Sequence, residues 1–266
     1  MKDDNTQALL VVSFGTSYEE TRKKTIEMLE TRLADAFPKR KLYRAWTSNF
    51  IIKKVYKTHG LKIDSIEESL ERMETDGITD ILVQPTHLID GFENRRLFSL
   101  LAERRSSFNT IRLGNCLLSS DKDVKQIAQA LNTIYPLKDN YALILMGHGS
   151  SRQPTDMYAR LEGSFRGTGN KQIYIGTIED DHSLERILDH IRKQRPDRIV
   201  LAPLMIVAGS HVNTEMAGDD PASWKNVIST EGFDVRVVKR GLGEYKEIAN
   251  IFVARAIQAK QPEYMN

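Results

Sequence analysis

The stretch ALILMGHGSS, residues 142–151, joins an apolar run to a histidine that lies between two glycines. Its apolar residues are continuous rather than alternating, which is typical of a strand covered on both faces in a parallel sheet. Glycine has no side chain and adopts backbone conformations that other residues avoid, so Gly147 and Gly149 allow a sharp bend. The stretch therefore predicts a buried strand that ends in a loop presenting His148.

Similar apolar runs recur along the chain and alternate with segments of helical periodicity. The runs cover residues 8–14, 78–86, 141–147, 171–177, 197–207 and 233–239. Apolar residues at helix spacing include Ile26, Leu29, Leu33 and Phe37, and later Leu184, Ile187, Leu188 and Ile191. Strand and helix patterns that alternate in this way predict a doubly wound α/β architecture.

The first half of the sequence resembles the second half. ALLVVSFGTS (8–17) is similar to ALILMGHGSS, and ILVQPTHLIDG (81–91) is similar to IVLAPLMIVAG (199–209). In each half a Gly/Ser loop follows the first strand, and a strand containing proline comes later. We therefore expect two similar doubly wound lobes, residues 1–138 and 139–266, each a parallel sheet flanked by helices.

The composition indicates an ordinary globular protein. The chain has 266 residues, 40% of them hydrophobic, and 38 Lys and Arg against 36 Asp and Glu, a net charge of +2. This balance argues against nucleic-acid binding, which needs a one-sided basic surface. A single cysteine, Cys116, excludes an internal disulfide and is compatible with a reducing compartment. We see no signal peptide and no apolar run of about 18 residues that could span a membrane, and so expect a cytoplasmic protein.

Four reactive residues follow apolar runs at the predicted carboxyl ends of strands. They are His87, His148, Glu179 and His211. Ligands of open α/β sheets bind outside these strand ends, so the four share an edge of the predicted sheets. Each also has a structural explanation: a histidine there is often hydrogen-bonded within the fold, Glu179 can begin a helix, and His211 can share a helix face with Glu215.

Together these residue types favour a metal site over a purely structural role. Neutral imidazole binds metals or accepts protons near pH 7. Two imidazoles and a carboxylate suit a borderline divalent ion such as cobalt, nickel, iron or zinc. A structural zinc site is disfavoured because no thiolate is offered, Cys116 lying elsewhere in the sequence.

The loop SFGTS (13–17) is the second candidate for ligand binding. It precedes a helix expected to begin near Tyr18, and a helix N-terminus with free N–H groups and hydroxyls attracts anions. The loop has neither the dinucleotide fingerprint nor the Walker pattern, and GLGE (241–244) is only a fragment of one. We therefore expect no organic cofactor. The loop binds carboxylates of an organic ligand, or it simply caps the helix.

The combination of motifs resembles a known family. The segments LLVVSFGTS, THLIDG, MGHG, PLMIVAGSH, SWK and GLGE, in this order and spacing, are similar to the anaerobic cobalt chelatases of vitamin B12 synthesis, the sirohydrochlorin cobaltochelatases of the CbiK type. The resemblance extends from Ala8 to about Ala259. It implies two similar α/β lobes that enclose a cleft for a tetrapyrrole, in agreement with the internal similarity.

The resemblance also implies which residues form the site. His148 in MGHG, His211 in VAGSH and Glu179 in IGTIE match the family's metal ligands, so most ligands fall in the lobe 139–266. His87 in THLIDG matches a position facing the cleft and is expected to assist in proton transfer or in contact with the macrocycle.

These residues suggest a mechanism for inserting Co2+ into sirohydrochlorin or precorrin-2. Acidic side chains of the tetrapyrrole dock on the loop that contains Ser13, Thr16 and Ser17. The metal is held beneath the ring by the two histidines and the glutamate, and the imidazoles accept the two pyrrole protons. Gly147 and Gly149 clear the approach of His148 to the ring, because bulkier neighbours would block it.

Other functions use the same residues. Fe2+ or Ni2+ is an alternative substrate metal, since the same ligands bind all three ions. A carrier that binds a tetrapyrrole or a metal without catalysis is another. A metal-dependent hydrolase is disfavoured because HExxH is absent. A homo-oligomer and a monomer both remain open. No role is assigned to Asp180, Asp181, Glu215 or Trp224.

Overall fold

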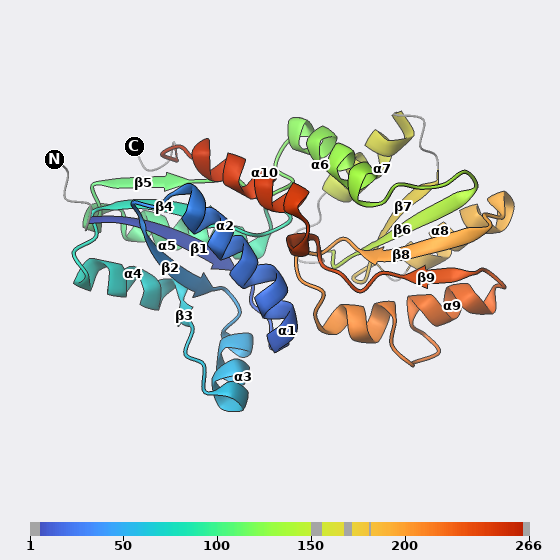
Figure 1. Cartoon of the computed structure of the whole chain (residues 1–266), viewed down its shortest axis with the longest axis horizontal. Helices are drawn as coiled ribbons and strands as arrows, with labels where there is room; N and C mark the ends of the chain where they lie inside the picture. The colour runs from blue at the N-terminus through green and yellow to red at the C-terminus, as the bar shows by residue number, and fades with distance from the viewer. Residues whose placement is uncertain (1–5, 150–155, 168–171, 181, 263–266) are drawn as a thin grey trace. The chain divides into compact units, whose positions relative to one another are not determined.

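The computed structural model describes residues 6–149, 156–167, 172–180 and 182–262. The chain divides into two compact units (Figure 1). Unit 1 comprises Met1–Leu117 together with Ile248–Asn266, and unit 2 comprises Leu118–Glu247. This division differs from the expected split after residue 138 in two places, because residues 118–138 belong to unit 2 and the C-terminal helix returns to the N-terminal sheet.

Unit 1 is built on a five-stranded parallel sheet with the order β3-β2-β1-β4-β5. The strands are β1 (Gln7–Ser13), β2 (Lys41–Trp46), β3 (Asp64–Ser65), β4 (Asp80–Pro85) and β5 (Thr110–Leu113). Strand order reverses between β1 and β4, which pair in register from Gln7↔Asp80 to Val12↔Pro85. This reversal is the topological switch point of the sheet, where ligands of doubly wound folds bind.

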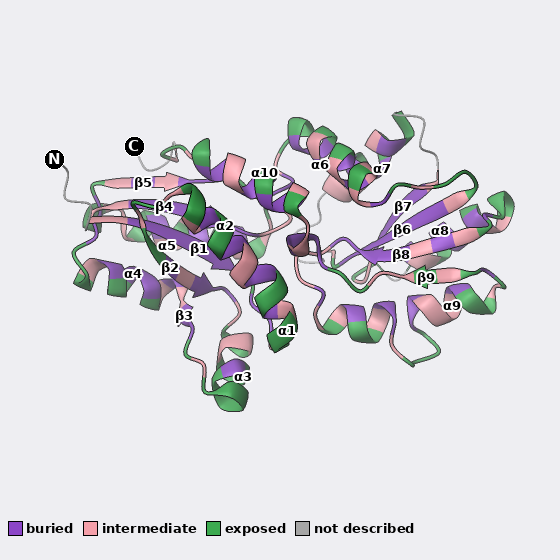
Figure 2. Ribbon diagram, in the orientation of Figure 1, coloured by how far each residue is buried: buried purple, intermediate pink, exposed green. Residues whose placement is uncertain are grey.

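Helices cover both faces of this sheet, as Figure 2 shows by the buried colour of β1 and β4. The helices of unit 1 are α1 (Glu19–Arg22), a π-helical turn (Lys23–Glu27), α2 (Met28–Ala36), α3 (Asn49–His59), α4 (Ile66–Thr75), α5 (Phe92–Glu103) and α10 (Lys246–Ile257). Leu10 and Val12 of β1 pack in a core with residues of α4 and α5. Leu9 and Val11, on the opposite face, pack with Leu33 of α2 and with residues of α10.

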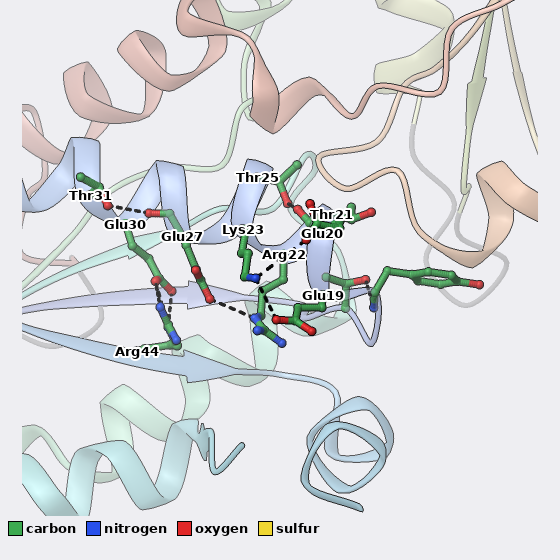
Figure 3. Close-up of polar contacts among 12 residues, drawn as sticks. Glu19, Glu20, Thr21, Arg22, Lys23, Thr25, Glu27, Glu30, Thr31 and Arg44 are labelled. Carbon is green, nitrogen blue, oxygen red and sulfur yellow. Dashed lines mark hydrogen bonds and ion pairs between the residues drawn. The ribbon is translucent and has the colours of Figure 1, made fainter. Parts of the chain in front are cut away.

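A polar network fixes the α1–α2 helix against β2 (Figure 3). Glu30, which is buried, forms an ion pair with Arg44 of β2. Burial raises the pKa of Glu30 even though Arg44 opposes this effect. Arg22 donates from Nε to Glu27 at 2.9 Å across the π-helical turn. Without these two ion pairs, the charged side chains on this helix face would have a large desolvation cost.

Unit 2 has a four-stranded parallel sheet with the order β7-β6-β8-β9. Its strands are β6 (Tyr141–Gly147), β7 (Ile173–Thr177), β8 (Arg198–Pro203) and β9 (Val235–Val237). Its helices are α6 (Asp121–Ile134), α7 (Met157–Gly167), α8 (Ser183–Gln194), a π-helical turn (Val212–Met216) and α9 (Trp224–Thr230). One face of the sheet packs in a core with Ile187, Leu188 and Ile191 of α8 and with Trp224 of α9. Here β6 and β8 flank the switch point.

The two parallel sheets flanked by helices confirm the expected fold class. All six predicted apolar runs contain strands, and both helical patterns fall in helices, except that Phe37 lies just beyond the end of α2. The strands β2, β3 and β5 were not predicted. β2 (KLYRAW) contains two basic residues, and β3 and β5 are only 2 and 4 residues long. In the described part of the chain, no helix is long and apolar enough to cross a membrane.

Candidate functional site

The candidate site of unit 2 lies at the carboxyl edge of its sheet. His148 follows β6 directly, and His211 follows β8 by a loop, so the two histidines leave the strands on either side of the switch point. Glu179 follows β7, which pairs with β6 up to Gly147↔Thr177. The doubly wound topology therefore gathers three residues that are far apart in sequence.

The glycines beside His148 allow close packing within unit 2. A Cβ atom on Gly147 would lie 2.8 Å from Cε1 of Tyr158, and one on Gly149 would lie 3.2 Å from the Cβ of Glu179. Gly149 also has a positive φ of +88°, which side chains disfavour. The glycines thus let the loop approach β7 and Tyr158, a phenol whose pKa is raised to about 12 by burial. Sequence reasoning gave no signal for Tyr158.

His148, Glu179 and His211 lie together. Nδ1 of His148 is 3.5 Å from Oε1 of Glu179. The imidazole rings of His148 and His211 meet edge to face, with centroids 4.8 Å apart and planes at 80°. The backbone N–H of Glu179 donates to the carbonyl of His148 at 3.1 Å, which ties the two loops together. Their positions after strands predicted that these residues and His87 share the carboxyl edge of the sheets. The structure places these three side by side in unit 2, whereas His87 belongs to unit 1.

Hydrogen bonds favour one tautomer for each of the two histidines. Nδ1 of His148 is 3.2 Å from the carbonyl oxygen of Gly149, and Nδ1 of His211 is 3.1 Å from Oε1 of Glu215. Both partners are acceptors, so each Nδ1 carries the hydrogen and each Nε2 keeps its lone pair. Glu215 lies on the π-helical turn after His211, and its spacing of four residues was the sequence signal for this contact. The pKa of Glu215 is lowered overall. Burial alone would raise it, but hydrogen bonds from Thr214, the backbone and His211 outweigh burial.

The side chains are gathered but not arranged as ligands of one ion. Among the residues that the structure describes, no group of three or more His, Cys, Asp or Glu side chains could hold a metal ion as placed. Glu179 faces Nδ1 of His148 rather than Nε2. All three side chains are partly exposed, so their rotamers can change without repacking the core. Metal binding would therefore need rotation of these side chains.

The segment GLGE (241–244) supports the loop that carries His211. Leu242 N–H donates to the carbonyl of Met205 at 2.8 Å, and Gly243 N–H donates to that of Ile206 at 2.9 Å. A Cβ atom on Gly241 would lie 2.5 Å from the carbonyl oxygen of Ile206. The segment that resembled a fragment of a nucleotide motif is thus a backbone clamp, in which residues 241–244 hydrogen-bond to the loop at 205–206. Gly241 is needed because a side chain there would collide with the backbone of Ile206.

Two residues without an assigned role have structural ones. Trp224 is buried in the core of unit 2, and a Cβ atom on Gly176 would lie 2.7 Å from its ring. Asp180 accepts a hydrogen bond from the backbone N–H of His182 at 3.2 Å, at the start of α8. Asp181 lies outside the described residues.

In unit 1, His87 lies at the corresponding switch point. It follows β4, and neighbouring Thr86 shares a 2.8 Å hydrogen bond with Ser13 at the end of β1. Both ring nitrogens of His87 are buried and have no hydrogen-bond partner among the described residues. Burial lowers the pKa of His87 from 6.5 to about 4, against the opposing influence of Asn94 and Asp90. His87 is therefore neutral at pH 7.

The buried ring nitrogens of His87 make stability depend on pH. The unfolded chain takes up the His87 proton near pH 6.5 and the folded chain only near pH 4, so the stabilisation is complete above pH 6.5 and is lost as pH falls toward 4. We expect it to contribute about 3 kcal/mol at most. Urea unfolding between pH 7 and 4.5 should show a shallower loss for His87→Leu than for the parent chain. Equal slopes would contradict the lowered pKa.

The hydroxyls of the SFGTS loop are largely engaged within unit 1. Ser13 and Thr16 are buried, and Thr16 Oγ1 accepts a hydrogen bond from the backbone N–H of Tyr18 at 3.2 Å. Ser17 is half-buried. The loop does lead into α1, as predicted, and of its three hydroxyl residues Ser17 is the one with an exposed side.

Comparisons with known proteins identify relatives along nearly the whole chain. The family model described as cobalt chelatase (CbiK) matches residues 7–261. The sirohydrochlorin cobaltochelatase of Salmonella typhimurium is 36% identical over 255 residues, covering 95% of this chain and 96% of that protein. The sirohydrochlorin cobaltochelatase CbiKC of Nitratidesulfovibrio vulgaris is 29% identical over 251 residues, covering 93% and 88%.

Solved structures share the fold at lower identity. SirB from Bacillus subtilis with Fe3+ has a TM-score of 0.64 at 15% identity and covers 95% of both chains. A multi-domain protein from Deinococcus radiodurans, described as structurally similar to chelatases, has a TM-score of 0.59 at 12% identity and covers 97% of this chain and 56% of that one.

Proposed function

Because the chain belongs to the cobalt chelatase family and is therefore a metal chelatase, we propose that it inserts Co2+ into sirohydrochlorin using His148, His211 and Glu179. The observation that carries the assignment of residues is the pair of imidazoles at the switch point of unit 2, with ring centroids 4.8 Å apart. Both offer Nε2 lone pairs, and a carboxylate lies beside them. This donor set suits Co2+.

The reaction exchanges two pyrrole protons for one divalent ion. Rotation of Glu179 away from Nδ1 of His148 brings its carboxylate to the side of the Nε2 atoms, where the three side chains hold Co2+. As the metal passes to the pyrrole nitrogens, the released imidazoles accept the two protons. General-base assistance of this kind is worth about 10²- to 10⁴-fold in rate.

The remaining site residues serve the tetrapyrrole. Ser17, with the SFGTS loop, receives an acidic side chain of the substrate, whereas Ser13 and Thr16 shape the loop from within. His87 contacts the macrocycle as a neutral ring, since a group with a pKa of about 4 is a weak proton acceptor at pH 7. Gly147 and Gly149 act indirectly, because they let the loop that carries His148 pack closely against Tyr158 and Glu179. A cytoplasmic location is supported by the lone Cys116, which cannot form an internal disulfide.

Anaerobic mixing of the purified chain with sirohydrochlorin and Co2+, followed by absorption, tests this function. We expect conversion well beyond one equivalent of protein. Saturation at one equivalent would instead identify a carrier and overturn catalysis. Parallel reactions with Fe2+ and Ni2+ show which ion is preferred, and faster turnover with either one would overturn the assignment to cobalt.

Glu215 gives a separate prediction because it orients His211. Carboxylates that hold the far nitrogen of a metal-binding imidazole typically contribute 10- to 100-fold to metal affinity or activity. We expect Glu215→Ala to lower kcat/KM for Co2+ by about this factor, and Glu215→Gln, whose amide oxygen can still accept from Nδ1, to retain most of it. Steady-state kinetics against Co2+ concentration measure both. Equal losses in the two variants would contradict an orienting role through the hydrogen bond.

A further inference from the structure

Three phenylalanines of unit 1 are exposed to an unusual degree. The chain has nine, and Phe50 is 72% exposed while Phe14 and Phe92 are each 49% exposed. A single exposed aromatic residue needs no explanation, but several on a ligand-binding edge do. Each of these three follows the carboxyl end of a strand: Phe14 follows β1, Phe50 follows β2 and Phe92 follows β4.

These strands are neighbours in the sheet, in the order β2-β1-β4. The connections after them are also linked directly. Ser48 N–H donates to the carbonyl of Phe14 at 3.3 Å, and Arg96 of α5 donates to the carbonyl of Thr47 at 3.3 Å. Phe50 is the second residue of α3 and Phe92 the first of α5. The three rings therefore belong to one edge of the sheet, the edge of the switch point and of His87.

Basic residues accompany two of these rings at helical spacing. Lys53 and Lys54 come three and four residues after Phe50, and Arg95 comes three residues after Phe92, so each lies on the same side of its helix as the ring. All three are exposed, and none of them forms an ion pair with another described residue. Arg96, the residue after Arg95, differs from these three because it forms an ion pair with Glu67.

We propose that Phe14, Phe50 and Phe92 form an aromatic platform for the face of the tetrapyrrole, with Arg95, Lys53 and Lys54 meeting its acidic side chains. The argument rests on the proposed function and is one of complementarity. A flat conjugated macrocycle stacks on aromatic rings, and its peripheral carboxylates need cations at the rim of the apolar surface. A second copy of this chain would bring the same cations to the same edge, and like charges there disfavour that occupant.

Binding of metal-free sirohydrochlorin to the full chain, measured by absorption titration without Co2+, tests the platform. We expect Phe50→Ala and Phe92→Ala each to raise Kd by about 3- to 10-fold, the range for a lost aromatic contact, and the double variant by about 10- to 100-fold. Arg95→Gln should raise Kd and reduce its dependence on salt, because it removes a screened attraction. The matched control is Tyr56→Ala, which removes a 62% exposed ring from α3 six residues beyond Phe50.

The outcomes separate this inference from the proposed function. If the parent chain inserts Co2+ but the double variant binds sirohydrochlorin with unchanged Kd, the platform is overturned and the proposed function stands. A drop in oligomeric state of the double variant, seen by light scattering at unchanged Kd, would also overturn it by showing that the rings cover a second copy. Parent chain that fails to bind or metallate sirohydrochlorin overturns both. Because each of the three rings is about half exposed or more, the variants should remain folded, which thermal unfolding checks.

Discussion

Replacement of His148 by alanine is expected to lower the rate of Co2+ insertion by at least about 10²- to 10⁴-fold, with the fold intact. The side chain removed has two proposed tasks, as metal ligand and as proton acceptor. His211 cannot perform both tasks alone, because the variant keeps only one imidazole and one carboxylate to hold the metal and accept two protons. Folding should be preserved because the His148 side chain is exposed, and its polar contacts with Gly149 and Glu179 lie at the surface of unit 2.

Anaerobic initial rates with sirohydrochlorin and Co2+ measure the effect, and circular dichroism with thermal unfolding checks the fold. His59→Ala provides the control, because His59 is an exposed histidine at the end of α3. It should retain parental activity. Full turnover in the His148 variant would remove that residue from the mechanism.

The second large effect is expected from Gly241→Ala. This substitution adds one methyl group at a position outside the histidine cluster. The new Cβ atom would lie 2.5 Å from the carbonyl oxygen of Ile206 and 2.7 Å from the backbone nitrogen of Ala208. Both contacts are with backbone, so relief requires movement of the segment that leads to His211. Overpacking of this kind costs about 1–3 kcal/mol of stability. A shift of about 1 Å in a catalytic group can cost about 10²-fold in rate, and we expect a loss of that order in kcat/KM.

Denaturant unfolding and steady-state kinetics test both parts of this prediction. Gly163→Ala is the matched control, because Gly163 lies in α7 with open space where its Cβ would be. That change should be neutral, or stabilising by up to about 1 kcal/mol through helix propensity. If Gly241→Ala behaved like the control, the clamp would not position His211.

Much of the fold and of the candidate site follows from local sequence. Continuous apolar runs mark strands buried on both faces, as β6 shows by matching its predicted bounds of 141–147. Parallel strands place their carboxyl ends along one edge, so residues directly after them can be brought together by topology alone. This reasoning predicted that His148, Glu179 and His211 meet, although their role as ligands remains a prediction.

Features decided by tertiary packing could not be read from the sequence. The charged β2 is held in the sheet by Arg44, which pairs with a buried glutamate from α2, a contact that no local pattern reports. The local sequence of α10 does not specify which sheet the helix covers, so its return to unit 1 was not predicted. The glycines around His148 were interpreted as clearing access to a macrocycle. In the structure their immediate neighbours are Tyr158 and the β7 loop, which are distant in sequence.

The return of α10 to unit 1 affects how the chain matures on the ribosome. Most of unit 2, residues 118–247, is translated before α10, so the face of the N-terminal sheet that α2 and α10 share is covered by α2 alone while unit 2 is synthesised. Leu9, Val11 and Leu82 are then open to solvent or to chaperones until Ala256 arrives. A nascent chain arrested before residue 246 would therefore be prone to aggregation, even though every strand that the structure describes had already been synthesised.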